Sequence, residues 1–208
     1  LTQTEYDGLN TGRGSISGNM FNAIRQLPNT PIYDVNNPTG YNINLSTGTM
    51  GRWDNLENIG DNITNIVYVL DHNKFQSKIK RTLVNAFLSA DLFDGLNYRF
   101  QASLDNANTG GFLYWNPIHG DGRPTGRLQN NNTDLTRWNL QHILNYNKTF
   151  FNDHNVGATA VVEYQKERNQ SFFGIGTGLV NEFYNQNLVT GSYSTQESGG
   201  GITELGIM

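Results

Sequence analysis

The dominant regular pattern in the chain is an alternation of apolar and polar residues, which predicts β-strands with one apolar and one polar face. The clearest stretch is Leu96–Asn106, in which Leu, Tyr, Phe, Ala and Leu alternate with Asn, Arg, Gln, Ser and Asp. A similar stretch runs from about Phe75 to Phe93. Between the two lies Asp94-Gly95, a dipeptide that suits a tight turn. The pattern therefore predicts an antiparallel hairpin.

A second hairpin is predicted further along the chain by the same pattern. Its strands are expected on either side of a short turn at Asn152–Asn155, with Trp138–Tyr146 before the turn and Val156–Tyr164 after it. Ile143 and Val161 interrupt the alternation, because each places an apolar residue on the polar face. The two hairpins together give strands long enough to cross a bilayer.

The rest of the sequence predicts loops with few regular elements. A short helix is expected over Ser17–Leu27, because apolar residues recur there at helical spacing and Pro28 stops the pattern. One further strand is expected around Phe183–Val189. The expected organisation is one partial β-barrel domain over 1–208, divided into a loop region 7–74, a hairpin 75–107, a loop 108–134, a hairpin 135–169, and a loop with the further strand in 170–208.

Loop lengths decide between two architectures for such strands. The short connections fall at one end of the hairpins and the long ones at the other. Outer-membrane β-barrels have this asymmetry, with short periplasmic turns and long extracellular loops, whereas soluble sandwiches distribute loop lengths between both ends. The favoured fold class is therefore all-β: an antiparallel transmembrane β-barrel segment that is part of a larger barrel.

Composition narrows the functional classes. The mean hydropathy of −0.54 resembles that of a soluble protein, but a barrel wall is apolar only at alternate positions and also averages as polar. A net charge of −4 without a basic stripe argues against a nucleic-acid partner. The absence of cysteine excludes disulfides and thiolate metal sites. The sequence begins without the charged and apolar regions of a secretory signal, so we expect it to be part of a longer polypeptide.

Candidate functional residues are few. No pattern of nucleophile, paired carboxylates, metal ligands or phosphate-binding glycines stands out, so no catalytic, cofactor or metal site and no enzymatic activity are predicted. Trp53, Tyr114 and Trp115 lie in expected loops beside Asn residues, and exposed aromatics there can stack on sugars or contact a partner protein. Packing between loops or an aromatic girdle at the membrane interface is the alternative role.

Several separated segments resemble the SusC/RagA family of TonB-dependent outer-membrane transporters. The first is NMFNAIRQLPNTPIYDVNNPTGYNI over Asn19–Ile43, with its Pro-x-x-Pro-Ile-Tyr motif before an NPTGYN loop. The segments NKFQSKIKRTLVNAFLSADLFDGLNYR and RWNLQHILNYNKTFFNDHNVGATAVVEYQ are similar to strand–turn–strand units of that family. The resemblance extends over most of the chain.

The resemblance implies a role in nutrient import across the outer membrane of a Gram-negative, Bacteroidota-like cell. The family has 22-stranded barrels with an N-terminal plug, imports glycans or peptides, takes energy from TonB, and often pairs with a SusD-like surface lipoprotein. No plug, TonB box or closing strand is evident in this sequence, so only wall and loops are expected here, in contact with outer-membrane lipid. The alternative hypothesis is a soluble all-β carbohydrate-binding module that displays Trp53 and Trp115.

Overall fold

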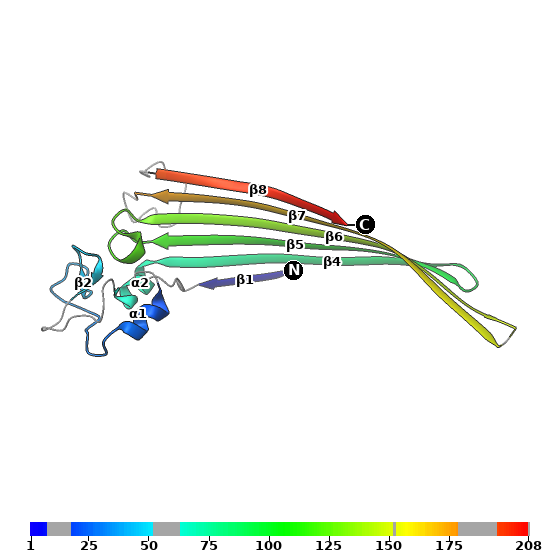
Figure 1. Cartoon of the computed structure of the whole chain (residues 1–208), viewed down its shortest axis with the longest axis horizontal. Helices are drawn as coiled ribbons and strands as arrows, with labels where there is room; N and C mark the ends of the chain where they lie inside the picture. The colour runs from blue at the N-terminus through cyan, green and yellow to red at the C-terminus, as the bar shows by residue number, and fades with distance from the viewer. Residues whose placement is uncertain (8–17, 52–62, 152, 179–194, 208) are drawn as a thin grey trace.

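The computed structural model describes residues 1–7, 18–51, 63–151, 153–178 and 195–207. Its main feature is a six-stranded sheet in the order β1-β4-β5-β6-β7-β8, in which every neighbouring pair is antiparallel (Figure 1). The strands are β1 (Thr2–Asp7), β4 (Lys74–Phe93), β5 (Leu96–Trp115), β6 (Arg127–Phe150), β7 (His154–Thr177) and β8 (Thr195–Ile207). The predicted all-β fold class is confirmed.

Both predicted hairpins are present, but their strands are longer than the sequence pattern indicated. The prediction of a loop over 108–134 is wrong. β5 continues to Trp115 and β6 begins at Arg127, so the connection between them is only 116–126. Alternation stops in these strand ends, because Asn130–Asp134 is polar at every position and Phe112–Trp115 is apolar or aromatic at every position. Side chains instead bond across the strands, as from the Asn108 amide to Asn132 (3.0 Å). Likewise β7 continues past 169 to Thr177.

The end of the chain is also more regular than expected. β8 pairs with β7 along Gln165–Thr177, within the region expected to be mainly loop. The strand predicted around Phe183–Val189 lies outside the described residues. The turn predicted at Asn152–Asn155 is shifted, because β7 already begins at His154.

The sheet has one apolar face over the half that carries the short turns. Strand register places Leu88, Phe100, His142 and Val162 in one row across β4, β5, β6 and β7. On this face the Nδ1 atom of His142 forms a hydrogen bond with the hydroxyl of Tyr98, at 2.7 Å. The same face carries Val84, Ala86, Ala90, Ala102, Leu104, Trp138, Leu140, Leu144, Ala158, Ala160 and Tyr164. We call this surface the apolar band.

The apolar band ends over two rows, because Lys166 on β7 already lies beside Trp138 in the row of Val84 and Leu104. The next row on the same face contains Thr82, Asn106, Thr136 and Arg168. From Val84 to Leu92 the band extends roughly 25–30 Å along β4, at about 3.3 Å per residue. The nine residues from Val84 to Leu92 fall within the ~9–11 that a tilted strand needs to cross a bilayer. Beyond the boundary row the strands continue without a regular alternation, and both faces carry polar residues together with apolar ones such as Phe112 and Phe172.

A small folded unit lies at the end of the sheet opposite the two short turns (Figure 1). We call it the cap and define it as residues 18–51, 63–73 and 116–126. It contains α1 (Asn19–Arg25), β2 (Ile43–Asn44), β3 (Thr49–Met50), α2 (Ile66–His72) and the 3-10 helix η1 (Gly120–Gly122). The helix predicted over Ser17–Leu27 is therefore confirmed as α1, whereas the other described parts of the expected loop region 7–74 are more structured than predicted.

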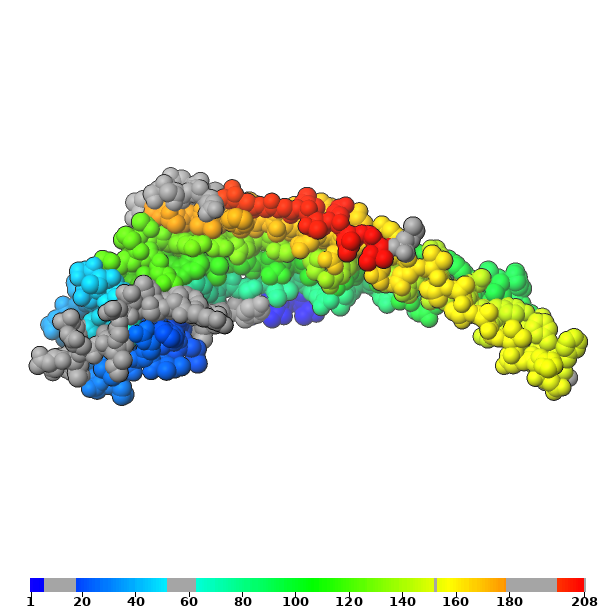
Figure 2. Space-filling model, viewed as in Figure 1, coloured from blue at the N-terminus to red at the C-terminus, as the bar shows by residue number. Residues whose placement is uncertain are grey.

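The apolar interior of the described residues lies mainly in the cap and where the cap meets the sheet. The fully buried large side chains include Ile63, Tyr68, Leu128 and His119. By contrast, Leu88 and Val162 in the apolar band are 66% and 62% exposed. Figure 2 shows the sheet as a thin curved slab that extends away from the cap. No helix in the described part of the chain is both long and apolar enough to cross a membrane.

The Asp94-Gly95 turn gives a first testable prediction. Gly95 has a φ of +85°, and a Cβ added there would lie 2.6 Å from the backbone oxygen of Asn147 on β6. We expect Gly95→Ala to destabilise the full-length protein by about 1–2 kcal/mol, because L-residues are strained at positive φ. The measurement is the denaturant midpoint of the folded protein in detergent.

Gly110→Ala is the control for this substitution. Gly110 lies within β5. A Cβ added there would lie 3.9 Å from its nearest neighbouring atom. Its midpoint is expected to stay close to that of the unmodified protein. Equal losses at both positions would contradict the strain argument at the turn.

Candidate functional site

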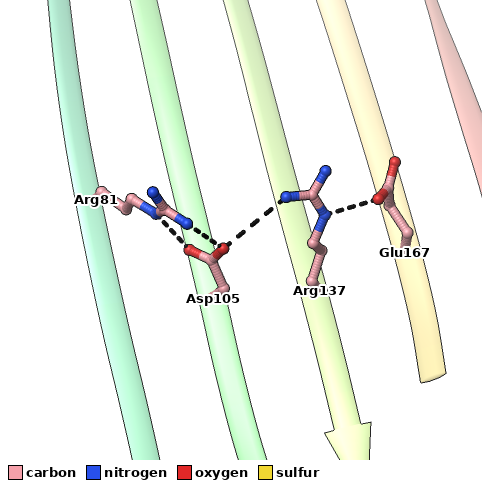
Figure 3. A network of polar contacts seen from close by, with 4 residues as sticks. All are labelled: Arg81, Asp105, Arg137 and Glu167. Atoms are coloured by element: carbon pink, nitrogen blue, oxygen red, sulfur yellow. Dashed lines mark hydrogen bonds and ion pairs between the residues drawn. The ribbon is translucent and has the colours of Figure 1, made fainter. Parts of the chain in front are cut away.

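The face of the sheet opposite the apolar band carries a chain of opposite charges across four strands (Figure 3). Arg81 on β4 donates to both carboxylate oxygens of Asp105 on β5, from Nε at 2.8 Å and from Nη2 at 2.7 Å. Arg137 on β6 lies next, with Nη1 4.0 Å from Asp105 and Nε 2.7 Å from the Oε2 of Glu167 on β7. We call Arg81, Asp105, Arg137 and Glu167 the ionic rung.

Strand register explains why these side chains meet. Asp105, Arg137 and Glu167 are directly paired across β5, β6 and β7, so their side chains leave the same face at the same height. Arg81 pairs with Ala107 and reaches Asp105 diagonally. The side chains of Arg81 and Arg137 are 50% and 51% exposed, and exposed ion pairs contribute only ~0.2–1 kcal/mol each. The stability of the sheet therefore depends little on the rung.

Amide side chains occupy the neighbouring rows of the same face. Asn85, Ser103, Asn139 and Gln165 form one row across the four strands. The carboxylate of Glu163 in the next row accepts from Asn139 at 2.7 Å and from Gln165 at 2.6 Å. A hollow of about 410 Å³ lies over this area. Its lining includes Ser103, Asp105, Arg137, Asn139, Gln165 and Glu167.

The only large aromatic side chain on this face level with the apolar band in β4–β7 is Phe87. The guanidinium of Arg99 lies over its ring, 4.5 Å from the centroid. An aromatic ring covered in this way has one face fewer for stacking on a ligand. The described wall from the ionic rung toward the turns therefore has no bare aromatic ring, and its polar side chains are interrupted by Leu83, Ile143 and Val161.

The cap is attached to the β5–β6 connection by buried hydrogen bonds. His119 is fully buried, and its Nε2 accepts from the backbone N–H of Asn65 at 2.8 Å. The Asn65 side chain caps α2 by accepting from the backbone of Tyr68, and it donates to the carbonyl of Ile32 at 2.7 Å. Burial, with a smaller contribution from the charge of His72, lowers the pKa of His119 to about 4.

Two further contacts complete this attachment. The guanidinium of Arg123 donates to the backbone carbonyls of Leu45, Ser46 and Thr47. At the start of the connection, Asn116 donates from its backbone and side-chain nitrogens to the Asn73 side chain, at 2.9 and 2.6 Å. The connection 116–126 is thereby held to segments that are distant in sequence.

The three predicted contact residues have different positions. Trp53 lies outside the described residues. Tyr114 is only 4% exposed, so in this structure its ring is not presented to a ligand. Trp115 ends β5, with the ring of Phe75 at 5.2 Å on edge and the guanidinium of Arg127 at 5.1 Å. The structure does not bring Tyr114 and Trp115 together into one platform, since they lie on opposite faces of the strand.

The ionic rung was not predicted from the sequence. The sequence pattern shows Asp105 on the polar face of its strand, but Arg81 and Glu167 lie at positions that the pattern alone does not pair with it. Counting outward from the Asp94-Gly95 turn would have placed Arg81 near Asp105, because that turn fixes the register of β4 and β5. The pairing of β5 with β6 depends on a longer connection. No group of three or more potential metal ligands occurs among the described residues.

Comparison with solved structures identifies similar folds. The chain is similar to a chain in the structure of the RagAB peptide transporter, with a TM-score of 0.59, 18% identity, and coverage of 80% of this chain and 19% of that chain. A second similar structure is the RagAB peptide importer in the "closed-closed" state, with a TM-score of 0.58, 17% identity, and coverage of 74% and 18%. At this identity the likeness shows the fold alone.

Over about four fifths of its length, the chain thus has a fold similar to part of a transporter chain. The chain spans about a fifth of the length of the solved chains that it matches. No protein-family model matches the sequence. A comparison with curated proteins also gives no match.

Proposed function

We propose that the chain is part of the barrel wall of a SusC/RagA-like, TonB-dependent transporter that imports a nutrient, glycan or peptide, across the outer membrane. The observation that carries this proposal is the two-faced sheet. One face bears an apolar band of limited height, and the other bears the ionic rung and amide rows. The fold likeness to RagAB transporter chains supports the same role.

In this proposal the apolar band contacts outer-membrane lipid. Leu88, Val162 and their neighbours are exposed on this face. Lipid chains would cover such an apolar surface, as they do on the outside of membrane barrels. The face with the ionic rung then lines the water-filled interior. The boundary row with Thr82, Asn106 and Thr136 then lies at the membrane–water interface on the outer side, with Lys166 one row below it.

The strand ends beyond that boundary and the cap then lie outside the cell. Long connections are extracellular in such barrels, and the cap is built on the long connection 116–126. We place a SusD-like surface lipoprotein at this end as partner. Energy coupling to TonB is assigned to parts of the transporter outside this chain, and no catalytic role is proposed for any residue here.

The proposal is tested with the full-length protein expressed in a Gram-negative host. We expect it in the outer-membrane fraction, extractable only with detergent, with a gel mobility that changes on heating because an intact barrel resists SDS. A carbohydrate-binding module is the alternative, and it would stay soluble without detergent. Soluble, heat-insensitive material that binds oligosaccharide would overturn the transporter proposal.

A further inference from the structure

Two cations that share one carboxylate lie at the end of the apolar band away from the short turns. Lys166 and Arg168, which we call the basic pair, project from β7 on the same face as the band. Glu204 on β8 lies between them, with Oε2 3.3 Å from the Lys166 Nζ and Oε1 3.5 Å from the Arg168 Nε. One carboxylate neutralises only one of the two cations, so the group keeps a net positive charge.

The basic pair lies at the height of the boundary row. Arg168 belongs to that row, and Glu204 pairs with it directly. Lys166 starts one row lower, inside the band, but its Nζ reaches Glu204 and the side chain therefore bends toward the boundary. Lysine side chains near a membrane surface extend to the interface in this way, because an ammonium group in hydrocarbon is costly. In the proposed orientation, both cations meet the headgroups of the outer leaflet.

The surrounding charges leave this group positive. Across β4–β8, the boundary row and the rows on either side of it contain three cations and two carboxylates, since Lys80 and Asp134 join the three residues above. Asp134 accepts from the neutral side chains of Thr136 and Asn106, at 3.2 and 3.3 Å. Within the described residues, the terminal nitrogens of Arg168 form no hydrogen bond. A phosphate suits such a surface, because its oxygens accept from both ammonium and guanidinium groups.

A hollow of about 520 Å³ lies on the same face, further from the apolar band. Phe172 lines it and is 55% exposed. It follows Arg168 by four residues on β7, or roughly 13 Å along an extended strand. Gly200 pairs with Phe172 and has no side chain to cover the ring.

The lining of this hollow suits a sugar. The face of the Phe172 ring can stack on the C–H groups of a pyranose. The amide side chains of Asn130 and Asn132 can hydrogen-bond with its hydroxyl groups. Lys78 and Glu5 also line the hollow, but they neutralise each other at 2.8 Å.

We infer that this face binds the headgroup of a phosphorylated glycolipid of the outer leaflet. The basic pair holds a phosphate of the headgroup, and the hollow at Phe172 holds one of its sugars. The apolar band continues directly below the basic pair, so the acyl chains of the same lipid cover it. This inference rests on the proposed membrane orientation, and it concerns the lipid-facing side of the wall rather than the transported cargo.

Titration of the full-length protein in detergent with defined lipids, followed by native mass spectrometry, tests the inference. The probes are lipid A, which is a phosphorylated disaccharide lipid, the same lipid without phosphate, and phosphatidylglycerol, which has a phosphate but no sugar. We expect lipid A to bind most tightly. Arg168→Gln is expected to weaken the binding of lipid A and of phosphatidylglycerol about fivefold, because one cation is lost. Phe172→Ala is expected to weaken the binding of lipid A alone.

Glu204→Gln is expected to have the opposite effect. Removal of the shared carboxylate frees both cations for phosphate, so lipid A is expected to bind about fivefold more tightly. If these three residues serve only to join β7 to β8, Glu204→Gln will lower the denaturant midpoint without tightening lipid binding. That result would overturn the inference.

Lys148→Gln is the matched control. Lys148 lies on the same face near the short turns, and its side chain is 39% exposed, compared with 40% for Lys166. Its Nζ is 3.2 Å from Asp94, a carboxylate of its own. Its lipid A affinity is expected to be unchanged. Equal losses for Arg168→Gln and Lys148→Gln would mean that the effect of charge is not local, and the inference would be wrong.

The transporter proposal and the lipid site can fail separately. A protein that stays soluble without detergent contradicts the transporter proposal. A heat-modifiable outer-membrane protein that binds lipid A no better than its phosphate-free form, or no better than inorganic phosphate, contradicts only the lipid site.

Discussion

Leu88→Arg is expected to destabilise the inserted full-length protein by about 2–4 kcal/mol, the cost of placing a cation near the bilayer midplane on the lipid face of a barrel. Leu88 lies within the apolar band on β4 and is 66% exposed in the described sheet. In water an exposed leucine could be replaced by arginine at little cost. The size of the loss therefore reports directly on what covers this face.

Thr82→Arg is the control on the same strand and the same face. Thr82 belongs to the boundary row, where an arginine is expected to cost only about 0–1 kcal/mol because its charge reaches the interface. The measurement is the denaturant midpoint of the two variants in lipid vesicles. Similar midpoints for Leu88→Arg and Thr82→Arg would argue that no membrane lies against the apolar band.

The second large effect is expected at His119. Removing its imidazole by His119→Ala leaves the buried N–H of Asn65 without an acceptor and opens a void beneath Tyr68, whose ring lies 5.3 Å from that of His119. We expect the docking of the cap to weaken by about 2–4 kcal/mol. Hydrogen exchange at the Asn65 and Asn73 amides measures this loss locally.

The same residue predicts a pH dependence of cap docking. The pKa of His119 is lowered from 6.5 to about 4 in the folded state, so the undocked cap binds a proton that the docked cap does not. Docking is therefore fully stable above pH 6.5 and weakens as the pH falls toward 4. The linked free energy is about 3 kcal/mol.

His119→Gln separates titration from packing. Glutamine keeps an acceptor but does not titrate, so the protection of the cap amides relative to their intrinsic exchange rates is expected to stay constant between pH 6.5 and 4. His154→Gln is the control, because His154 begins β7 at the opposite end of the sheet and is exposed. If the protection of the cap amides in His119→Gln still changes with pH, another group controls docking.

The sequence predicted those parts of the fold in which one face of a strand is apolar. Leu96–Asn106 alternates over its full length, and Asp94-Gly95 fixes the position of the turn, so the first hairpin was correctly located. The same reasoning ended β5 at about 107, because Asn108–Trp115 lacks the alternation. In that segment pairing is maintained by the register of the hairpin and by amide bonds such as Asn108 to Asn132, which leave no periodic signal.

The cap and the ionic rung were less predictable for a related reason. The cap depends on contacts between distant residues, such as His119 with Asn65 and Arg123 with the Leu45 carbonyl. No local pattern indicates such pairs, and the Asn- and Gly-rich sequence around them resembles an ordinary loop. To predict the ionic rung, the registers of three strand pairs must be known together. The sequence indicates only one of them well, the register of β4 and β5 at the Asp94-Gly95 turn.

The apolar band also constrains how such a sheet can assemble. An unpaired backbone N–H or C=O group costs several kcal/mol in lipid. Within the second hairpin, β6 is paired with β7 over its whole length, from Arg127 to Phe150. Entry into the bilayer must therefore be cooperative, with strands pairing as the apolar face leaves water.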